Sequence, residues 1–243
     1  MRVQVLGYPV DAIESSEAIA LVQKAVMERL SLHIVTLNAE MTMQGQGDQE
    51  LSEILKQAQL VLPDGSGVVW AIRRQGKRVS KLAGVDFLGQ MAAWCAREGK
   101  RVFLFGAAEG VAAEAAEALK HFYPGLQIAG VHSGFFSPEE EPVILETIRS
   151  AEPDILWVAL GVPRQEKWIA RHREGLSVPV MMGVGGSFDV LASRVKRAPA
   201  IFRRLHLEWL FRLIQEPWRW RRMAATLPKF AWQVIMTDRR GTA

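Results

Sequence analysis

Short apolar runs rich in β-branched residues alternate along the chain with longer amphipathic runs of helical period, and this alternation restricts the fold more than any other feature. Such a succession places strands in parallel and covers the sheet with the intervening helices. We therefore predict an α/β fold, a Rossmann-like, mostly parallel sheet with helices on both faces. The expected strands lie near Val3–Leu6, Ile34–Thr36, Leu60–Leu62, Val102–Phe105, Ile128–Val131, Ile155–Leu160 and Val180–Val184, and the expected helices near Ser16–Leu30, Gln49–Gln59, Val85–Arg97, Val111–His121, Pro138–Ala151 and Gln165–Arg173.

The alternation stops after Arg194. Residues Pro199–Glu216 and Trp218–Met236 have the pattern of two amphipathic helices, separated at Pro217. This region also holds four of the eight tryptophans and 12 basic against 3 acidic residues, a net charge of +9, whereas residues 1–193 carry −5. We predict a core at 1–193 and a basic, Trp/Arg-rich helical appendage at 194–243. The excess charge indicates an anionic partner: phospholipid, a phosphorylated substrate or nucleic acid.

The bulk composition bounds the protein class. With 243 residues, 49% of them hydrophobic, the chain has enough apolar material for one sizeable core. Cys95 is the only cysteine, so no internal disulfide forms and a reducing, cytosolic compartment is expected. No signal-peptide core is present, and no apolar run reaches the roughly 20 residues of a membrane-spanning helix. Any membrane contact is expected to be peripheral.

Polar residues and glycines follow five of the predicted strands. In open α/β sheets ligands bind beyond the carboxyl ends of the strands, so these loops are expected to form one active-site crevice. The loops are Thr36-Leu37-Asn38, Leu62-Pro63-Asp64-Gly65, Phe105-Gly106, Leu160-Gly161 and Val184-Gly185-Gly186.

Individual loops allow two interpretations each. Asp64 lies on a tight turn at a strand end, a placement that suits a general base, although turns favour Asp before Gly in any case. The turn that opens at Gly161 suits a phosphate, or is an ordinary strand-to-helix turn. Asp189 would accept hydrogen bonds from a ribose or base, or caps a helix.

Two other chemistries are disfavoured. Gly183–Asp189 resembles a dinucleotide fingerprint, but Phe188 stands where the third glycine belongs and the motif comes last in the sheet. No Asp-x-Asp occurs, and the five histidines have no metal-ligand spacing, so we expect no protein-bound catalytic metal.

A set of motifs that occur in order resembles the WecG/TagA/CpsF glycosyltransferases over residues 1 to about 230. One departure is Ser193, where the family usually has glycine. The motifs are Thr36-Leu37-Asn38, Leu62-Pro63-Asp64-Gly65, Gly161-Val162-Pro163-Arg164-Gln165-Glu166, Gly183–Asp189, Arg197-Ala198-Pro199 and Leu207-Glu208-Trp209-Leu210-Phe211-Arg212.

The resemblance implies an inverting, metal-independent transfer of an N-acetylhexosamine-type sugar from a UDP-sugar to a polyprenyl-diphosphate-linked acceptor, in teichoic acid or surface-polysaccharide synthesis. It implies that Asp64 is the catalytic base and that Thr36, Asn38 and Gln165 contact the substrate. The UDP-sugar is a substrate and no cofactor is expected. The implied substrate-binding residues are Arg212, Arg219 and Arg222 of the appendage with Gly106, Gly161, Gly185, Gly186 and Asp189 of the strand-end loops.

The appendage has two interpretations as well. Arginine and tryptophan at helical spacing are typical of a helix that lies in a membrane interface, which would hold the protein on the inner face of the cell membrane. The alternative is a packed helix pair with a solvated basic face. The competing functions are a nucleotide-binding oxidoreductase that uses NAD(P) and a nucleic-acid binder that uses the basic tail; the resemblance favours neither, and it leaves a homo-oligomer open.

Overall fold

The computed structural model of the chain describes residues 1–199, 201–202, 207–217 and 220–241, with only the backbone of residues 212, 222 and 238–241. Its centre is a six-stranded sheet in which every pairing is parallel, in the order β4-β3-β8-β7-β5-β6. Its strands are β3 (Leu32–Leu37), β4 (Leu60–Pro63), β5 (Arg101–Gly106), β6 (Gln127–His132), β7 (Ile155–Ala159) and β8 (Val180–Gly183). The predicted Rossmann-like α/β fold is confirmed.

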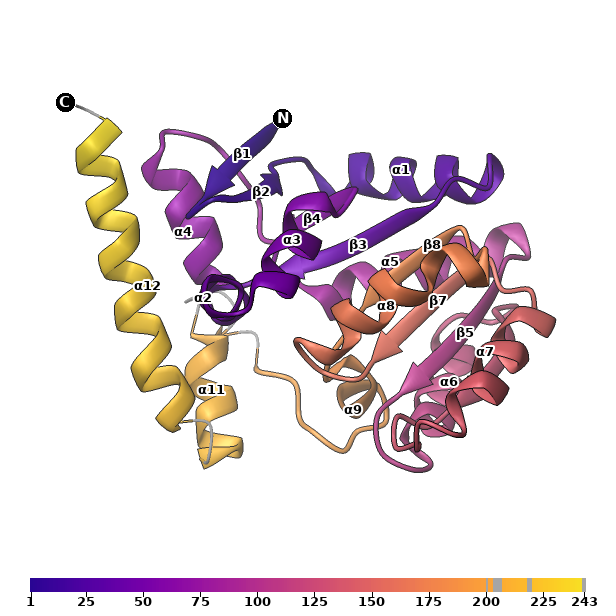
Figure 1. The fold of residues 1–243 in the computed structure, drawn as a ribbon. Helices are drawn as coiled ribbons and strands as arrows, with labels where there is room; N and C mark the ends of the chain where they lie inside the picture. Colours follow the sequence, from indigo (N-terminus) through magenta and orange to yellow (C-terminus); the bar gives the residue numbers. More distant parts are fainter. Residues whose placement is uncertain (200, 203–206, 218–219, 242–243) are drawn as a thin grey trace.

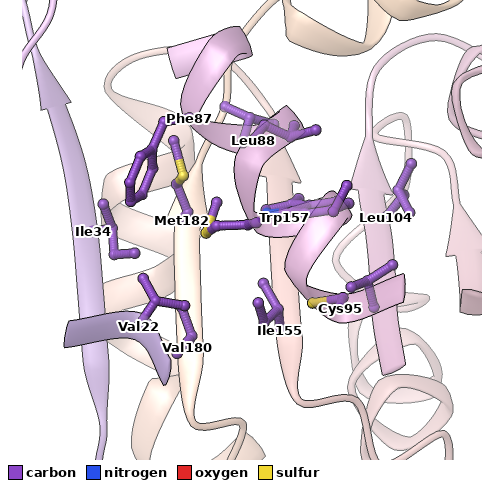
Figure 2. Packing of buried hydrophobic residues seen from close by; sticks show 14 of the residues in the cluster. Val22, Ile34, Phe87, Leu88, Cys95, Leu104, Ile155, Trp157, Val180 and Met182 are labelled. Atoms are coloured by element: carbon purple, nitrogen blue, oxygen red, sulfur yellow. The ribbon is translucent and has the colours of Figure 1, made fainter. Parts of the chain in front are cut away.

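Alternate residues of each strand point to opposite faces of the sheet, and both faces are apolar. Ile34, Met182, Trp157 and Leu104 lie in register across four adjacent strands and are buried on one face. Figure 2 shows them beneath Phe87 and Leu88. Four helices cover this face: α1 (Ser15–Met27), α5 (Gly84–Glu98), α6 (Val111–Phe122) and α9 (Ser187–Leu191).

The opposite face is covered in two parts. Phe103, Phe105 and Leu156 pack under α7 (Glu141–Ser150) and α8 (Arg164–Leu176). Over β3 and β4 the cover consists of β1 (Arg2–Val5), β2 (Tyr8–Asp11), α2 (Ala39–Gly47), α3 (Gln49–Gln57), α4 (Ser66–Arg74) and α12 (Trp220–Gly241).

The N-terminal strand differs from its predicted place. β1 pairs with β2 in a separate antiparallel two-stranded sheet and does not join the central one. A four-residue strand that turns back at Leu6 and Gly7 finds its partner locally. The sequence patterns also missed β2, α2, α4 and α9, each of which is nine residues or shorter.

In the appendage, the predicted break at Pro217 is present between α11 (Glu208–Gln215) and α12. The first predicted helix is wrong in its extent, because Leu207 is not helical and its N–H donates to the carbonyl of Phe202. α12 lies along α4 and α2 (Figure 1), and its Phe230 and Val234 are 2% and 4% exposed. None of the helices within the described ranges is long and apolar enough to cross a membrane.

Candidate active site

The five predicted loops all leave the same edge of the sheet, because the strands that precede them are parallel. β3 and β4 are neighbours, so their loops lie together. A Cβ atom on Gly65 would be 3.5 Å from the Cβ of Asn38. A Cβ on Gly84 would be 3.5 Å from the Thr36 hydroxyl oxygen and 3.8 Å from Oδ2 of Asp64. The structure therefore brings Thr36, Asn38 and Asp64 to one corner, beside the start of α5.

Asp64 lies on a fixed turn beside the amino end of α5. Its backbone N–H donates to the Leu37 carbonyl at 2.9 Å, which fixes the turn, and the side chain is only partly buried. The N–H of Gly84, the first residue of α5, points at Oδ2 from 3.5 Å. The amino end of a helix carries partial positive charge, so it stabilises negative charge at this position.

Asn38 has a structural task at this corner. Its Oδ1 accepts a hydrogen bond from the Met41 N–H at 2.9 Å, and its backbone carbonyl accepts from both the N–H and the hydroxyl of Thr42. These bonds cap the amino end of α2. Because Oδ1 is used in this cap, Asn38 would contact a substrate through its side-chain amide nitrogen.

Gln165 joins two of the loops from within. Its side chain is 2% exposed, and Oε1 accepts hydrogen bonds from the N–H groups of Gly161 at 3.1 Å and Gly185 at 3.0 Å. Its Nε2 donates to Oε1 of Glu166 at 2.9 Å. The side chain holds the loops after β7 and β8 together, so we infer that Gln165 positions them, and its predicted contact with substrate stays a prediction.

Glu166 is the buried partner of this brace. It is fully buried, and its Oε2 has no hydrogen-bond partner among the residues that the structure describes. Burial raises the pKa of Glu166 from 4.5 to about 7, because the ionised form is poorly solvated there. Glu166 was expected only as part of a motif, because a Glu in the first turn of a helix is usually a solvated charge.

We expect the free energy of unfolding to depend on pH through Glu166. A raised pKa in the folded state means that the contribution is fully present below about pH 4.5 and is lost as the pH rises through about 7. Between pH 5 and 8 the loss should be about 2–3 kcal/mol. Glu166→Gln should remove it, as measured by urea unfolding of both proteins at the two pH values.

The titration of His33 does not affect the difference between wild type and Glu166→Gln. Burial lowers its pKa to about 3, so its own contribution to stability is lost as the pH falls below about 6.5, in wild type and variant alike. This contribution cancels in the difference between the free energies of unfolding of the two proteins. Parallel pH profiles for wild type and Glu166→Gln would contradict the assignment of the raised pKa to Glu166.

The remaining loop residues divide into two kinds. Gly106 is required by the fold, because a Cβ at this position would lie 2.4 Å from the carbonyl oxygen of Ala159 on the neighbouring strand. Gly186 is exposed and precedes α9, whose first turn holds Asp189. The backbone carbonyl of Asp189 accepts from the N–H groups of Arg194 and Val195, which directs the chain into the appendage.

Ion pairs connect the appendage to the core near this corner. Lys81 and Glu208 pair at 2.6 Å, and Arg197 pairs with Asp86 on α5. Arg194 binds Glu114 on α6, which keeps the pKa of that carboxyl below its usual range. These pairs were missed from the sequence, because each joins residues more than 75 positions apart.

The predicted diphosphate-binding arginines cannot be placed against the site. Arg219 lies outside the described residues, and for Arg212 in α11 and Arg222 in α12 the side chains are outside them. Their role stays a prediction. Within the described ranges no three His, Cys, Asp or Glu side chains are grouped as metal ligands.

The parallel six-stranded sheet, with glycine loops and Asp64 at its carboxyl edge, defines a Rossmann-like α/β protein. The family model for the glycosyl transferase WecG/TagA/CpsF family matches residues 3–243. The chain belongs to this family and is a glycosyltransferase.

Curated relatives agree with this assignment. The chain is 40% identical over 207 residues to an N-acetylglucosaminyldiphosphoundecaprenol N-acetyl-beta-D-mannosaminyltransferase of Bacillus spizizenii. The matched region covers 85% of the chain and 79% of the relative. Proteins of the same name from Bacillus subtilis and Staphylococcus aureus are 36% and 34% identical over 213 residues, with 82% of each relative covered.

Proposed function

We propose that this glycosyltransferase moves an N-acetylmannosamine-type sugar from a UDP-sugar to N-acetylglucosamine carried on a polyprenyl diphosphate, for teichoic acid or surface-polysaccharide synthesis. The observation that carries the proposal is the extent of the match. Relatives named as N-acetylmannosaminyltransferases align with 85–87% of the chain. The structure also brings the family-motif residues Thr36, Asn38 and Asp64 together at one corner.

The chemistry is a single displacement with inversion. Asp64 accepts the proton of the acceptor hydroxyl, and the hydroxyl oxygen forms a bond to the anomeric carbon of the donor sugar. The bond from that carbon to the diphosphate oxygen breaks, and UDP leaves with the electron pair. Arginines suit the stabilisation of a leaving diphosphate because they are always charged and bind phosphate oxygens in a bidentate manner. We assign this task to Arg212, Arg219 and Arg222.

A membrane-linked acceptor requires the enzyme to work at a membrane, and we propose that the appendage attaches it peripherally to the inner face of the cell membrane. Trp209, Trp220 and Trp232 are 41%, 55% and 61% exposed, which supports an interfacial role for these rings. Trp218 lies outside the described residues.

The direct test is a transfer assay with a lipid-linked N-acetylglucosamine acceptor and a panel of UDP-sugars. We expect UDP-N-acetylmannosamine to give product with inverted anomeric configuration. Calorimetry with UDP and with NAD provides the binding control. A protein that binds NAD, ignores UDP and transfers no sugar would overturn the proposal.

We expect transfer to continue in EDTA. The chain has no Asp-x-Asp motif, and the arginines of the appendage supply the positive charge that a divalent ion provides in other glycosyltransferases. Initial rates with EDTA, with Mg²⁺ and with Mn²⁺ should agree within about twofold. Loss of a catalytic metal ion would raise the activation free energy by far more than the RT ln 2 that a twofold change in rate represents. A rate that disappears in EDTA and returns with Mn²⁺ would rule out the metal-independent mechanism.

A further inference from the structure

A second basic surface lies outside the appendage, in the part of the chain whose net charge is negative. At the end of α4 and in the loop that follows it, the sequence reads Arg73-Arg74-Gln75-Gly76-Lys77-Arg78, with four cations in six residues and no acid. We call residues 73–78 the basic loop. All four cationic residues are exposed. Lys81 follows, but it is half-buried and paired with Glu208, so it belongs to the core.

The neighbourhood of the basic loop leaves its positive charge in excess. A hollow of about 580 Å³ is lined by Arg73, Lys77 and Arg78 together with one acid, Glu14. The Glu14 carboxylate already accepts hydrogen bonds from the Ser80 hydroxyl and from the backbone at the start of α1. One acid against three cations in the same hollow makes this an anion-attracting surface.

An aromatic ring accompanies the cations. Trp70 is 36% exposed on α4, and the Arg74 guanidinium lies 5.5 Å from the centroid of its ring. Tryptophan is the residue that settles at the boundary between lipid headgroups and acyl chains, and arginine beside it binds the phosphates. This pairing distinguishes the surface from an ordinary solvated charge run.

The stripe that carries Trp70 and Arg74 borders α12. Gly67 is one turn before Trp70 and two turns before Arg74 on the same side of α4. A Cβ on Gly67 would lie 3.4 Å from the Phe230 ring of α12. The two helices run side by side, and the loop that leaves α4 lies at the same end of the pair as the last turn of α12 (Figure 1).

The outward side of α12 has matching chemistry. Met223, Leu227, Phe230 and Val234 recur every three or four residues and face the core. Trp232, two residues after Phe230 and so about 200° around the helix, points away from the core and is 61% exposed. Lys229 is exposed beside it. α12 and the basic loop thus present tryptophan and cations on adjoining surfaces.

We propose that the basic loop with Trp70 is a second membrane-binding element, which docks on the headgroups of anionic phospholipids beside α12. The inference rests on the proposed function, which places the acceptor in a membrane. A single interfacial helix is free to roll about its axis. A second contact on the core prevents that roll, and it holds the carboxyl edge of the sheet at a fixed orientation toward the lipid-linked acceptor.

The test is the double variant Lys77→Ala/Arg78→Ala in the full chain. Among the residues that the structure describes, Lys77 and Arg78 make no hydrogen bond or ion pair through their side chains, whereas Arg73 donates to the Val79 carbonyl and Arg74 stacks on Trp70. The matched control is Lys120→Ala/Arg171→Ala, which removes one exposed cation from α6, on the opposite face of the sheet from α12, and one from α8. The measurement is flotation with phosphatidylcholine vesicles, with and without phosphatidylglycerol.

We expect the loop variant to bind phosphatidylglycerol vesicles about 30-fold more weakly than wild type, from the contribution of each cation near an anionic surface. The control variant should bind like wild type. Equal binding of all three proteins would overturn the proposal. An equal loss of binding to vesicles of phosphatidylcholine alone would overturn it too. So would unchanged vesicle binding with a loss of binding to duplex DNA, because that result would assign the surface to nucleic acid.

A second readout separates this proposal from the proposed function. The loop variant should transfer sugar to a short-chain, water-soluble acceptor at the wild-type rate, and to an acceptor embedded in phosphatidylglycerol vesicles more slowly. Absence of transfer by wild type with either acceptor would count against the proposed function alone, because flotation does not depend on the sugar chemistry. A rate on the embedded acceptor equal to that of wild type, with vesicle binding lost, would overturn the orienting role.

Discussion

Asp64→Asn is expected to abolish sugar transfer while the protein stays folded and still binds UDP. The substitution keeps the shape of the side chain and removes its capacity to accept a proton, and general-base catalysis contributes about 10²–10⁴-fold to a rate. The backbone bond from the Asp64 N–H to Leu37 is unaffected, so the turn should hold. Single-turnover transfer rates and UDP calorimetry of the purified variant give the two halves of the result.

Asp189→Asn is the matched control, since Asp189 lies in the first turn of α9 after β8 and asparagine keeps an oxygen that can accept the hydrogen bonds predicted from the substrate. It should keep most of the activity. Thr36 and Asn38 substitutions should have milder effects than Asp64→Asn, although Asn38→Ala also removes the cap of α2 and should lower stability by about 1 kcal/mol. Near-normal turnover by Asp64→Asn with a strong loss in Asp189→Asn would move the base to Asp189.

The central sheet was predictable from local pattern because most of its strands are short, nearly continuous apolar runs. Ile155–Ala159 is one such run, buried throughout. The missed elements lack that contrast. α2 reads Ala-Glu-Met-Thr-Met-Gln-Gly-Gln-Gly, a poor helix former, and it forms because Asn38 caps it and because Gly45 leaves room for the Tyr8 ring of β2. The cap is a local signal, but the packing of Gly45 against Tyr8 is tertiary, so no local pattern records it.

The same distinction applies to the site. The strand-end rule placed Thr36, Asn38 and Asp64 at one edge, and adjacency of β3 and β4 brought them together. The rule says which loops meet, but not what each side chain touches. The buried face of α12 had a signal in the spacing of Met223, Leu227, Phe230 and Val234, which the alternation of arginine and tryptophan around it obscured. The cost of deleting the appendage therefore includes the exposure of the surface that Phe230 covers.

Gln165→Ala is expected to lower transfer about 100-fold, although the side chain is buried beneath the loops. Its Oε1 is the acceptor for the N–H groups of both Gly161 and Gly185. Removing it leaves two donors unpaired and opens a cavity, which should cost about 2–4 kcal/mol of the free energy of unfolding. The loops after β7 and β8 then lose their fixed spacing, and misplacement of about 1 Å in a substrate-positioning group is enough for a 10²-fold loss in rate.

Bracing and direct contact make different predictions for Gln165. If the side chain braces the loops, the Gly161 and Gly185 amides should exchange slowly with solvent in wild type and quickly in Gln165→Ala, whether or not UDP is bound. Gln165→Glu keeps an oxygen for both N–H groups, so it should protect these amides better than alanine does, even though it replaces the bond to Glu166 by a contact between two acids. Unchanged amide exchange in Gln165→Ala together with a 100-fold loss of transfer would instead make Gln165 a substrate contact, because only the ligand would then have lost a partner.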